Sequence, residues 1–115
     1  MGDLFGDYAP KYEMIIFCSN GKKKLNGSRD SNILKYNRTN NEFHPTQKPI
    51  KILRYLIEKS TEENELILDT FAGSFSTAFA AYDSKRKFIG YELDKEYFEA
   101  ATKRLKYHQQ QIRMF

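Results

Sequence analysis

The chain has 115 residues, of which 19 are Lys or Arg and 15 are Asp or Glu, so its formal net charge is +4. This length fits one domain, and a hydrophobic content of 40% supplies one small core and excludes a wholly disordered chain. No apolar run approaches the ~20 residues of a membrane-spanning helix. The first residues, MGDLFGDYAPKYE, lack the apolar stretch of a signal peptide. Cys18 is the single cysteine, which excludes an internal disulfide and a cysteine zinc site, so we expect a cytoplasmic protein.

The excess positive charge lies mainly in the first half of the chain. Residues 1–50 hold eight basic and five acidic side chains, whereas residues 51–115 hold eleven and ten. Such a cluster suits the phosphates of nucleic acid, since each contact releases a counterion, and it equally suits a solvated loop kept soluble by lysines. The candidate DNA contacts are Lys22, Lys23, Lys24, Arg29, Lys35 and Arg38.

The first predicted element is a strand over 12–18, YEMIIFC, which is short, apolar and followed by the turn signal Asn20-Gly21. Residues 19–43 are polar throughout, and we expect a long loop with at most one short strand at 32–36. Loops of this length in compact domains are typically functional or disordered.

The motif HPTQKP (44–49) precedes a predicted helix whose apolar residues from Ile50 to Ile57 share one face, with Pro49 placed for its first turn. Thr46 and Gln47 offer hydrogen bonds and Lys48 offers a charge. Alone, the hexapeptide is better explained as a rigid approach to a helix. A metal site at His44 is not favoured, because the only other histidine, His108, lies near the C-terminus.

The remaining pattern predicts a strand over 65–71, a helix over 72–82, a strand over 86–92 and a last helix capped by Asp94, with a frayed tail HQQQIRMF. Two strands on either side of a helix form a βαβ unit, which predicts a parallel sheet with a right-handed crossover and an α/β fold.

One candidate site follows from DTFAGSFST (69–77), where a strand ends in an acid and a small-residue turn leads into a helix. Such a turn brings backbone N–H groups close to a ligand, and Gly73 permits unusual backbone angles. Glu92 ends the next strand, where dinucleotide folds hold a ribose diol. A capped strand end plus a surface acid explains the pair equally well. The glycine pattern disfavours a nicotinamide enzyme.

Three blocks in this order resemble the C-terminal part of S-adenosylmethionine-dependent DNA amino-methyltransferases, in the subgroup whose catalytic segment precedes the cofactor segment. They are HPTQKP, D-x-F-x-G-S from Asp69, and G-x-E-x-x-x-x-Y-x-x-A-x-x-R-L from Gly90. Residues 12–21 are similar to the strand before the family's target-recognition region. Beyond HPTQKP, the matching residues are Asp69, Phe71, Gly73, Ser74, Thr77, Gly90, Glu92, Tyr97, Ala101, Arg104 and Leu105.

The resemblance implies a Rossmann-like methyltransferase fold, with three layers around a mostly parallel sheet, that is incomplete in this chain. It implies a strand plus basic loop at the end of the target-recognition region (1–43), a cofactor-binding βαβ portion (44–109) and a frayed tail (110–115). It also implies double-stranded DNA as partner, a flipped adenine or cytosine as substrate, and a restriction-modification setting. The residues that it implies in S-adenosylmethionine binding are Thr46, Gln47, Lys48, Asp69, Phe71, Gly73, Ser74 and Glu92.

The sequence departs from the family in two places. The family carries a D/N/S-P-P-Y/F/W catalytic segment, whereas the prolines here, at 10, 45 and 49, include no adjacent pair. We therefore assign no catalytic residue and expect the chain alone to be inactive. The family loop reads D-P-F-x-G-S-G-T-T, and Phe75 stands at its second glycine. If that position takes a positive φ, a bulky residue is strained by ~1 kcal/mol or more, and its ring could fill the cofactor space.

These departures leave three alternatives: a truncated methyltransferase portion, one half of a split enzyme whose partner polypeptide supplies the catalytic segment, and a non-catalytic DNA-binding or assembly module. If the family's sheet order applies, the strand over 12–18 does not neighbour the strand near residue 66. The isolated chain would then expose strand edges and an apolar face, which favours self-association.

Overall fold

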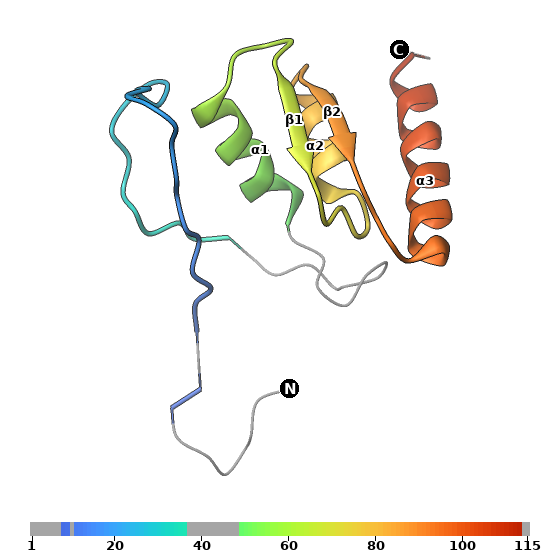
Figure 1. The fold of residues 1–115 in the computed structure, drawn as a ribbon, viewed down its shortest axis with the longest axis horizontal. Helices are drawn as coiled ribbons and strands as arrows, with labels where there is room; N and C mark the ends of the chain where they lie inside the picture. The colour runs from blue at the N-terminus through green and yellow to red at the C-terminus, as the bar shows by residue number, and fades with distance from the viewer. Residues whose placement is uncertain (1–7, 10, 37–48, 114–115) are drawn as a thin grey trace.

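A computed structural model describes residues 8–9, 11–36 and 49–113 (Figure 1). Two strands pair in parallel, with Leu66 opposite Lys87 and Asp69 opposite Gly90, so the βαβ unit expected from the sequence is confirmed. In chain order the elements are α1 (Ile50–Ser60), β1 (Leu66–Asp69), α2 (Ser76–Asp83), β2 (Lys87–Gly90) and α3 (Lys95–Arg113).

The core lies between the sheet and its helices. Ile57 of α1 packs on Ala80 and Ala81 of α2, with Ile67 and Phe88 of the strands against the same cluster. A second cluster joins the start of α2 to α3 through residues 72, 75, 78 and 101. The buried alanines allow α2 to approach its neighbours closely, because they add little side-chain bulk.

The opposite face of the sheet is apolar and exposed. Leu66, Leu68 and Ile89 alternate with the inward residues of their strands and are 57%, 60% and 43% exposed. Strand side chains alternate between two faces, so a sheet with apolar residues on both faces is suited to two covering layers. Within the described residues, one such layer is present. This is consistent with an incomplete α/β fold.

The predicted cap and C-terminal helix are observed, but the helix extends further than expected. Asp94 Oδ1 accepts a hydrogen bond from the backbone N–H of Tyr97 at 3.0 Å, which confirms the cap. The expectation of a tail frayed from residue 108 is wrong, because α3 continues to Arg113. His108 lies edge-on to the rings of Phe79 and Tyr82, and its Nε2 lies 2.7 Å from Asp83 Oδ1. These contacts with α2 hold the last turns of α3.

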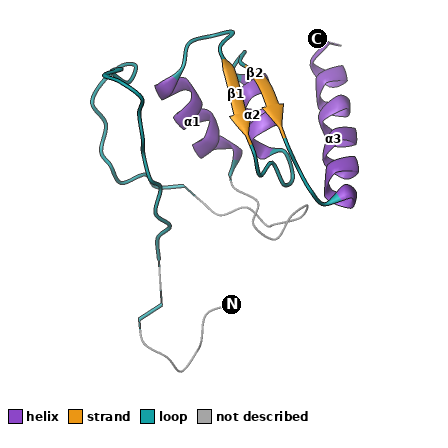
Figure 2. Cartoon of the chain, in the orientation of Figure 1, coloured by secondary structure: helices purple, strands orange, loops and turns teal. Residues whose placement is uncertain are grey.

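The expected strand over 12–18 is not formed. This stretch is loop in the structure (Figure 2), and Met14 and Ile16 are 82% and 85% exposed. A strand needs a hydrogen-bonded neighbour, and none lies beside this segment among the described residues. Residues 32–36 also form no strand, so the prediction of a long loop holds for 19–36, whereas 37–43 lie outside the described residues.

None of the described helices combines the length and the apolar character required to cross a membrane.

We predict that His108→Ala lowers the free energy of unfolding by about 1 kcal/mol, because it removes the hydrogen bond to Asp83 and two edge-on ring contacts. Urea denaturation followed by circular dichroism measures the change. Gln110→Ala is the control, since Gln110 lies exposed on the same helix. Equal stabilities of the two variants would show that the end of α3 is not held by His108.

Candidate cofactor site

The candidate site lies at the carboxyl edge of the two strands, where loop 70–75 leaves β1 and residues 91–94 leave β2 (Figure 1). Backbone pairing continues beyond the strands and brings these two connections together. The N–H of Tyr91 donates to the carbonyl of Asp69 at 3.0 Å, and the N–H of Ala72 donates to the carbonyl of Tyr91 at 2.8 Å. In open α/β sheets, ligands bind in the crevice at this edge.

Glu92 holds the two connections together with its carboxylate. Its Oε1 accepts a hydrogen bond from the N–H of Gly73 at 2.9 Å, and its Oε2 accepts one from the N–H of Asp94 at 3.0 Å. The side chain is only half-buried. Because each carboxylate oxygen has two lone pairs, both can also accept a hydrogen bond from a ligand hydroxyl.

Asp69 shapes the loop from within. Its Oδ1 accepts from the N–H of Phe71 at 3.0 Å, and its Oδ2 accepts from the hydroxyl of Thr77 at 2.6 Å. Asp69 therefore ties the end of β1 to the first turn of α2. Thr77 was absent from the predicted cofactor residues, although its place one turn into the expected helix was a usable signal.

The remaining predicted loop residues divide between exposed and buried positions. The ring of Phe71 is 87% exposed and is available to a ligand. Gly73 is buried with φ of 54°, a backbone angle that glycine tolerates. Ser74 is buried, its hydroxyl lies 3.1 Å from that of Ser76, and its carbonyl accepts from the Arg104 guanidinium at 2.5 Å. Ser74 thus stabilises the loop from its inner side. Burial of the Arg104 guanidinium lowers its pKa.

Phe75 has the positive φ at which a bulky residue is expected to be strained. It precedes α2 with φ of 64° and ψ of 29°, in the left-handed region. Its ring is only 6% exposed and lies in the core, 5.8 Å edge-on to Phe98 and 6.4 Å from Phe88 between ring centres. Burial of a phenyl ring contributes more stability than this backbone strain costs, which explains how the residue is accommodated.

The second predicted part of the site, Thr46, Gln47 and Lys48, lies outside the described residues. The structure does describe Pro49 and the helix that follows it. Figure 1 places the start of α1 at the same edge of the sheet as loop 70–75.

Among the described residues, the part of the basic segment around Lys23 lies away from the carboxyl edge. Lys23 Nζ lies 3.7 Å from Glu65 Oε2, just before β1, and the N–H of Asn26 donates to the carbonyl of Lys59 at the end of α1. This segment therefore lies toward the opposite, amino edge of the strands (Figure 1). Lys22, Lys24, Arg29 and Lys35 are exposed, and Arg38 lies outside the described residues.

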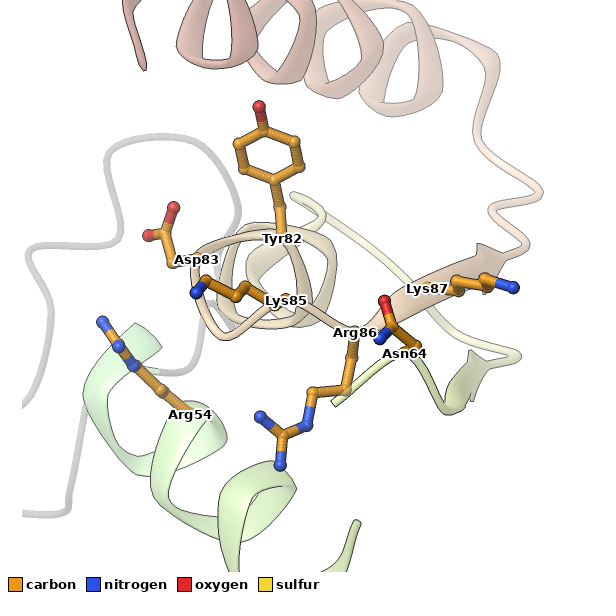
Figure 3. Close-up of a pocket in the computed structure, with 7 residues that line it drawn as sticks. All are labelled: Arg54, Asn64, Tyr82, Asp83, Lys85, Arg86 and Lys87. Carbon is orange, nitrogen blue, oxygen red and sulfur yellow. The ribbon is translucent and has the colours of Figure 1, made fainter. Parts of the chain in front are cut away.

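An open hollow of about 650 Å³ also lies at the amino edge, between α1 and the turn that joins α2 to β2 (Figure 3). Arg86 crosses its wall, and its guanidinium donates to the side chain and carbonyl of Thr61 and to the carbonyl of Ser84. This arginine joins α1 to the turn, so its charge is committed to protein carbonyls. The lining residues are Arg54, Asn64, Tyr82, Asp83, Lys85, Arg86 and Lys87.

Across residues 8–9, 11–36 and 49–113, no three or more His, Cys, Asp or Glu side chains are grouped so that they could hold a metal ion.

A family model described as DNA methylase, N6/N4 type, matches residues 5–103 of the chain. The chain therefore belongs to this DNA methyltransferase family. It is 42% identical over 110 residues to the type II methyltransferase M.HindIII of Haemophilus influenzae. The aligned region covers 90% of this chain and 36% of the relative. It is 47% identical over 64 residues to the DNA adenine methyltransferase YhdJ of Escherichia coli, covering 56% and 22%.

Solved structures agree with this assignment. The M1.HpyAVI–SAM complex superposes with a TM-score of 0.60 at 36% identity, covering 72% of this chain and 43% of that one. The cytosine-N4-specific PvuII DNA methyltransferase superposes with a TM-score of 0.51 at 34% identity, covering 53% and 22%. The chain thus has a partial α/β methyltransferase fold and spans less than half the length of these relatives.

We predict that Phe75→Gly destabilises the protein by about 2 kcal/mol, although glycine relieves the left-handed strain. Loss of a buried phenyl ring costs about 3–5 kcal/mol, whereas the relieved strain contributes about 1–3 kcal/mol. Phe75→Ala loses the ring and keeps the strain, so it should be less stable than Phe75→Gly by about 1 kcal/mol.

Denaturation of both variants beside Phe71→Ala, which alters an exposed ring of the same loop, measures these differences. A stability of Phe75→Gly at or above that of the unaltered protein would show that strain outweighs packing at this position.

Proposed function

We propose that this chain is the cofactor-binding portion of a DNA amino-methyltransferase and binds S-adenosylmethionine at the carboxyl edge of β1 and β2. The observation that supports this most directly is the Glu92 carboxylate, which accepts the N–H of Gly73 and keeps lone pairs for hydroxyl groups. Two vicinal hydroxyls of a ribose are the ligand groups that such a carboxylate binds.

The other loop residues fit the same ligand. The exposed ring of Phe71 offers an apolar surface, and the glycine at 73 allows close approach of the backbone. The Phe75 ring is accounted for by its contacts with Phe88 and Phe98 in the core, which argues against its filling the cofactor space. Thr46, Gln47 and Lys48, which precede α1 in the sequence, complete the proposed set, and Asp69 and Ser74 hold the loop in shape.

In the complete enzyme, S-adenosylmethionine supplies the methyl group, and the acceptor is the exocyclic amino group of an extruded base. The relatives' names include an adenine enzyme and a cytosine-N4 enzyme, so the proposal specifies the amino group and neither base. The proposed partner is double-stranded DNA, contacted by the basic segment, and the proposed location is the cytoplasm. Residues 1–43 would then end the target-recognition region and 44–109 form the cofactor portion.

We further propose that these 115 residues transfer no methyl group alone, because the family's chemistry uses a Pro-Pro segment and the three prolines here are separated. A purified preparation that incorporates labelled methyl groups into duplex DNA would refute this.

A second candidate function is that of a non-catalytic module, or half of a split enzyme, that works by associating with another polypeptide or with itself. The exposed apolar face of Leu66, Leu68 and Ile89 favours it, since contiguous apolar surface of this kind marks interfaces. Sedimentation distinguishes it: a monomer at all concentrations counts against self-association.

We predict that the chain binds S-adenosylmethionine and that Glu92→Gln weakens binding about tenfold or more, because the variant loses a charged acceptor for the ribose hydroxyls. Isothermal titration calorimetry measures the affinity. Glu96→Gln is the matched control, since it removes an exposed carboxylate nearby.

Equal affinities of the two variants would show that Glu92 does not contact the cofactor. Absence of binding by the folded, unaltered chain would remove the cofactor proposal itself.

A further inference from the structure

The segment 26–30 is fastened to the C-terminal half of α1 by contacts that the function above leaves unexplained. The amide of Asn26 donates from Nδ2 to the carbonyls of Glu58 and Thr61 at 2.9 and 2.8 Å. Its backbone N–H donates to the carbonyl of Lys59 at 2.8 Å. The last carbonyls of a helix lack partners within the helix, so one asparagine satisfies three carbonyls at this end.

A second set of contacts surrounds Asp30. Its Oδ2 accepts from the Tyr55 hydroxyl at 2.6 Å and lies 3.1 Å from Lys59 Nζ, while its Oδ1 accepts from Ser28 at 2.8 Å. Lys59 also donates to the carbonyl of Ser28 at 2.5 Å. Hydrogen bonds from Tyr55, Ser28 and Lys59 lower the pKa of Asp30 to about 2, which shows that these contacts favour its charged form.

The turn between these two anchors favours glycine, because Gly27 has φ of 71° in the left-handed region. A Cβ built there would lie 3.5 Å from Lys59 Nζ, an ordinary contact distance, so the backbone angle and not the space favours glycine. The chain can therefore turn tightly over the end of α1 and deliver both anchors to the same helix. We call residues 26–30 the α1 clasp.

The helix held by the clasp is itself fixed against the cofactor loop. Ile57 packs on Ala80 and Ala81 of α2, and Arg86 joins Thr61 to the turn after α2. The first residue of α2 directly follows loop 70–75. A continuous set of packed and hydrogen-bonded groups thus connects the clasp to the candidate cofactor site.

We propose that Asn26 is a positioning residue: by closing the C-terminal end of α1, it fixes the basic segment 22–29 in one orientation relative to the cofactor loop, ready for DNA phosphates. This inference rests on the proposed function, in which that segment contacts DNA. Lys22 and Lys24 precede the clasp, so loss of the Asn26 anchor loosens both charges without removing them, whereas Arg29 stays between the Ser28 and Asp30 contacts.

The test compares three forms of the full chain with the unaltered protein. Asn26→Ala removes the two side-chain hydrogen bonds, leaves the backbone bond to Lys59 and keeps every charge. Asn32→Ala is the matched control, since Asn32 is exposed in the same segment. A charge variant, Lys22→Gln with Lys24→Gln and Arg29→Gln, tests the DNA contact itself. Fluorescence anisotropy with a short duplex at low salt measures DNA affinity, and calorimetry measures S-adenosylmethionine affinity.

We expect Asn26→Ala to weaken DNA binding about tenfold, because only the docked fraction of the segment is competent to bind. The affinity for S-adenosylmethionine should match that of Asn32→Ala, which shows that the fold is retained. Amide hydrogen exchange over residues 26–30 should be about tenfold faster in Asn26→Ala than in the control.

Unchanged DNA affinity of Asn26→Ala, beside a weakened charge variant, would overturn the positioning role and leave the DNA contact standing. If the charge variant binds DNA as tightly as the unaltered chain, the DNA contact fails and the positioning role fails with it. Equal hydrogen exchange in Asn26→Ala and Asn32→Ala would show that Asn26 is not the anchor.

Discussion

The hydrogen bond from the N–H of Gly73 to the carboxylate of Glu92 is the contact on which the candidate site depends. Two parallel strands place their carboxyl ends side by side, and backbone hydrogen bonds of Ala72 and Tyr91 extend this pairing into the connections that follow. Glu92 adds a side-chain bond between the two connections by binding Gly73, and it also binds Asp94 within its own connection. The residue proposed to recognise the ribose therefore also assembles the surface that receives it.

The helices support different features at the two edges of the sheet. At the carboxyl edge it supports loop 70–75 through Thr77, Arg104 and the Phe75 ring. At the amino edge the C-terminal end of α1 carries the clasp and the basic segment. The 11 residues of α1 span about 16 Å, so the proposed cofactor surface and the basic segment are held apart by one rigid helix. A duplex that contacted both would have to span that separation.

Local pattern predicted the elements whose stability is largely local. Apolar periodicity located α1 and α3, and short apolar runs beside small residues located the parallel pair. The strand over 12–18 was wrong because strand formation depends on a neighbour that local pattern does not reveal. The end of α3 was misjudged because His108 is held by Asp83, 25 positions away in the sequence.

The candidate site was predicted only where it depends on the ends of the strands. Asp69, Gly73 and Glu92 meet at one edge, because the end of a parallel strand is a position that sequence can specify. The α1 clasp was missed, since Asn26 and Thr61 are 35 residues apart and a contact of this kind is not visible in local pattern.

The central claim, that the carboxyl edge of β1 and β2 is the cofactor surface, is tested most directly by titrating the ¹⁵N-labelled chain with S-adenosylmethionine and following backbone amide resonances. The account predicts saturable shifts at Phe71, Gly73 and Glu92, with little change at Lys85 and Lys87 on the opposite edge. Shifts confined to Lys85 and Lys87, or no shift at Gly73 at saturating cofactor, would contradict it.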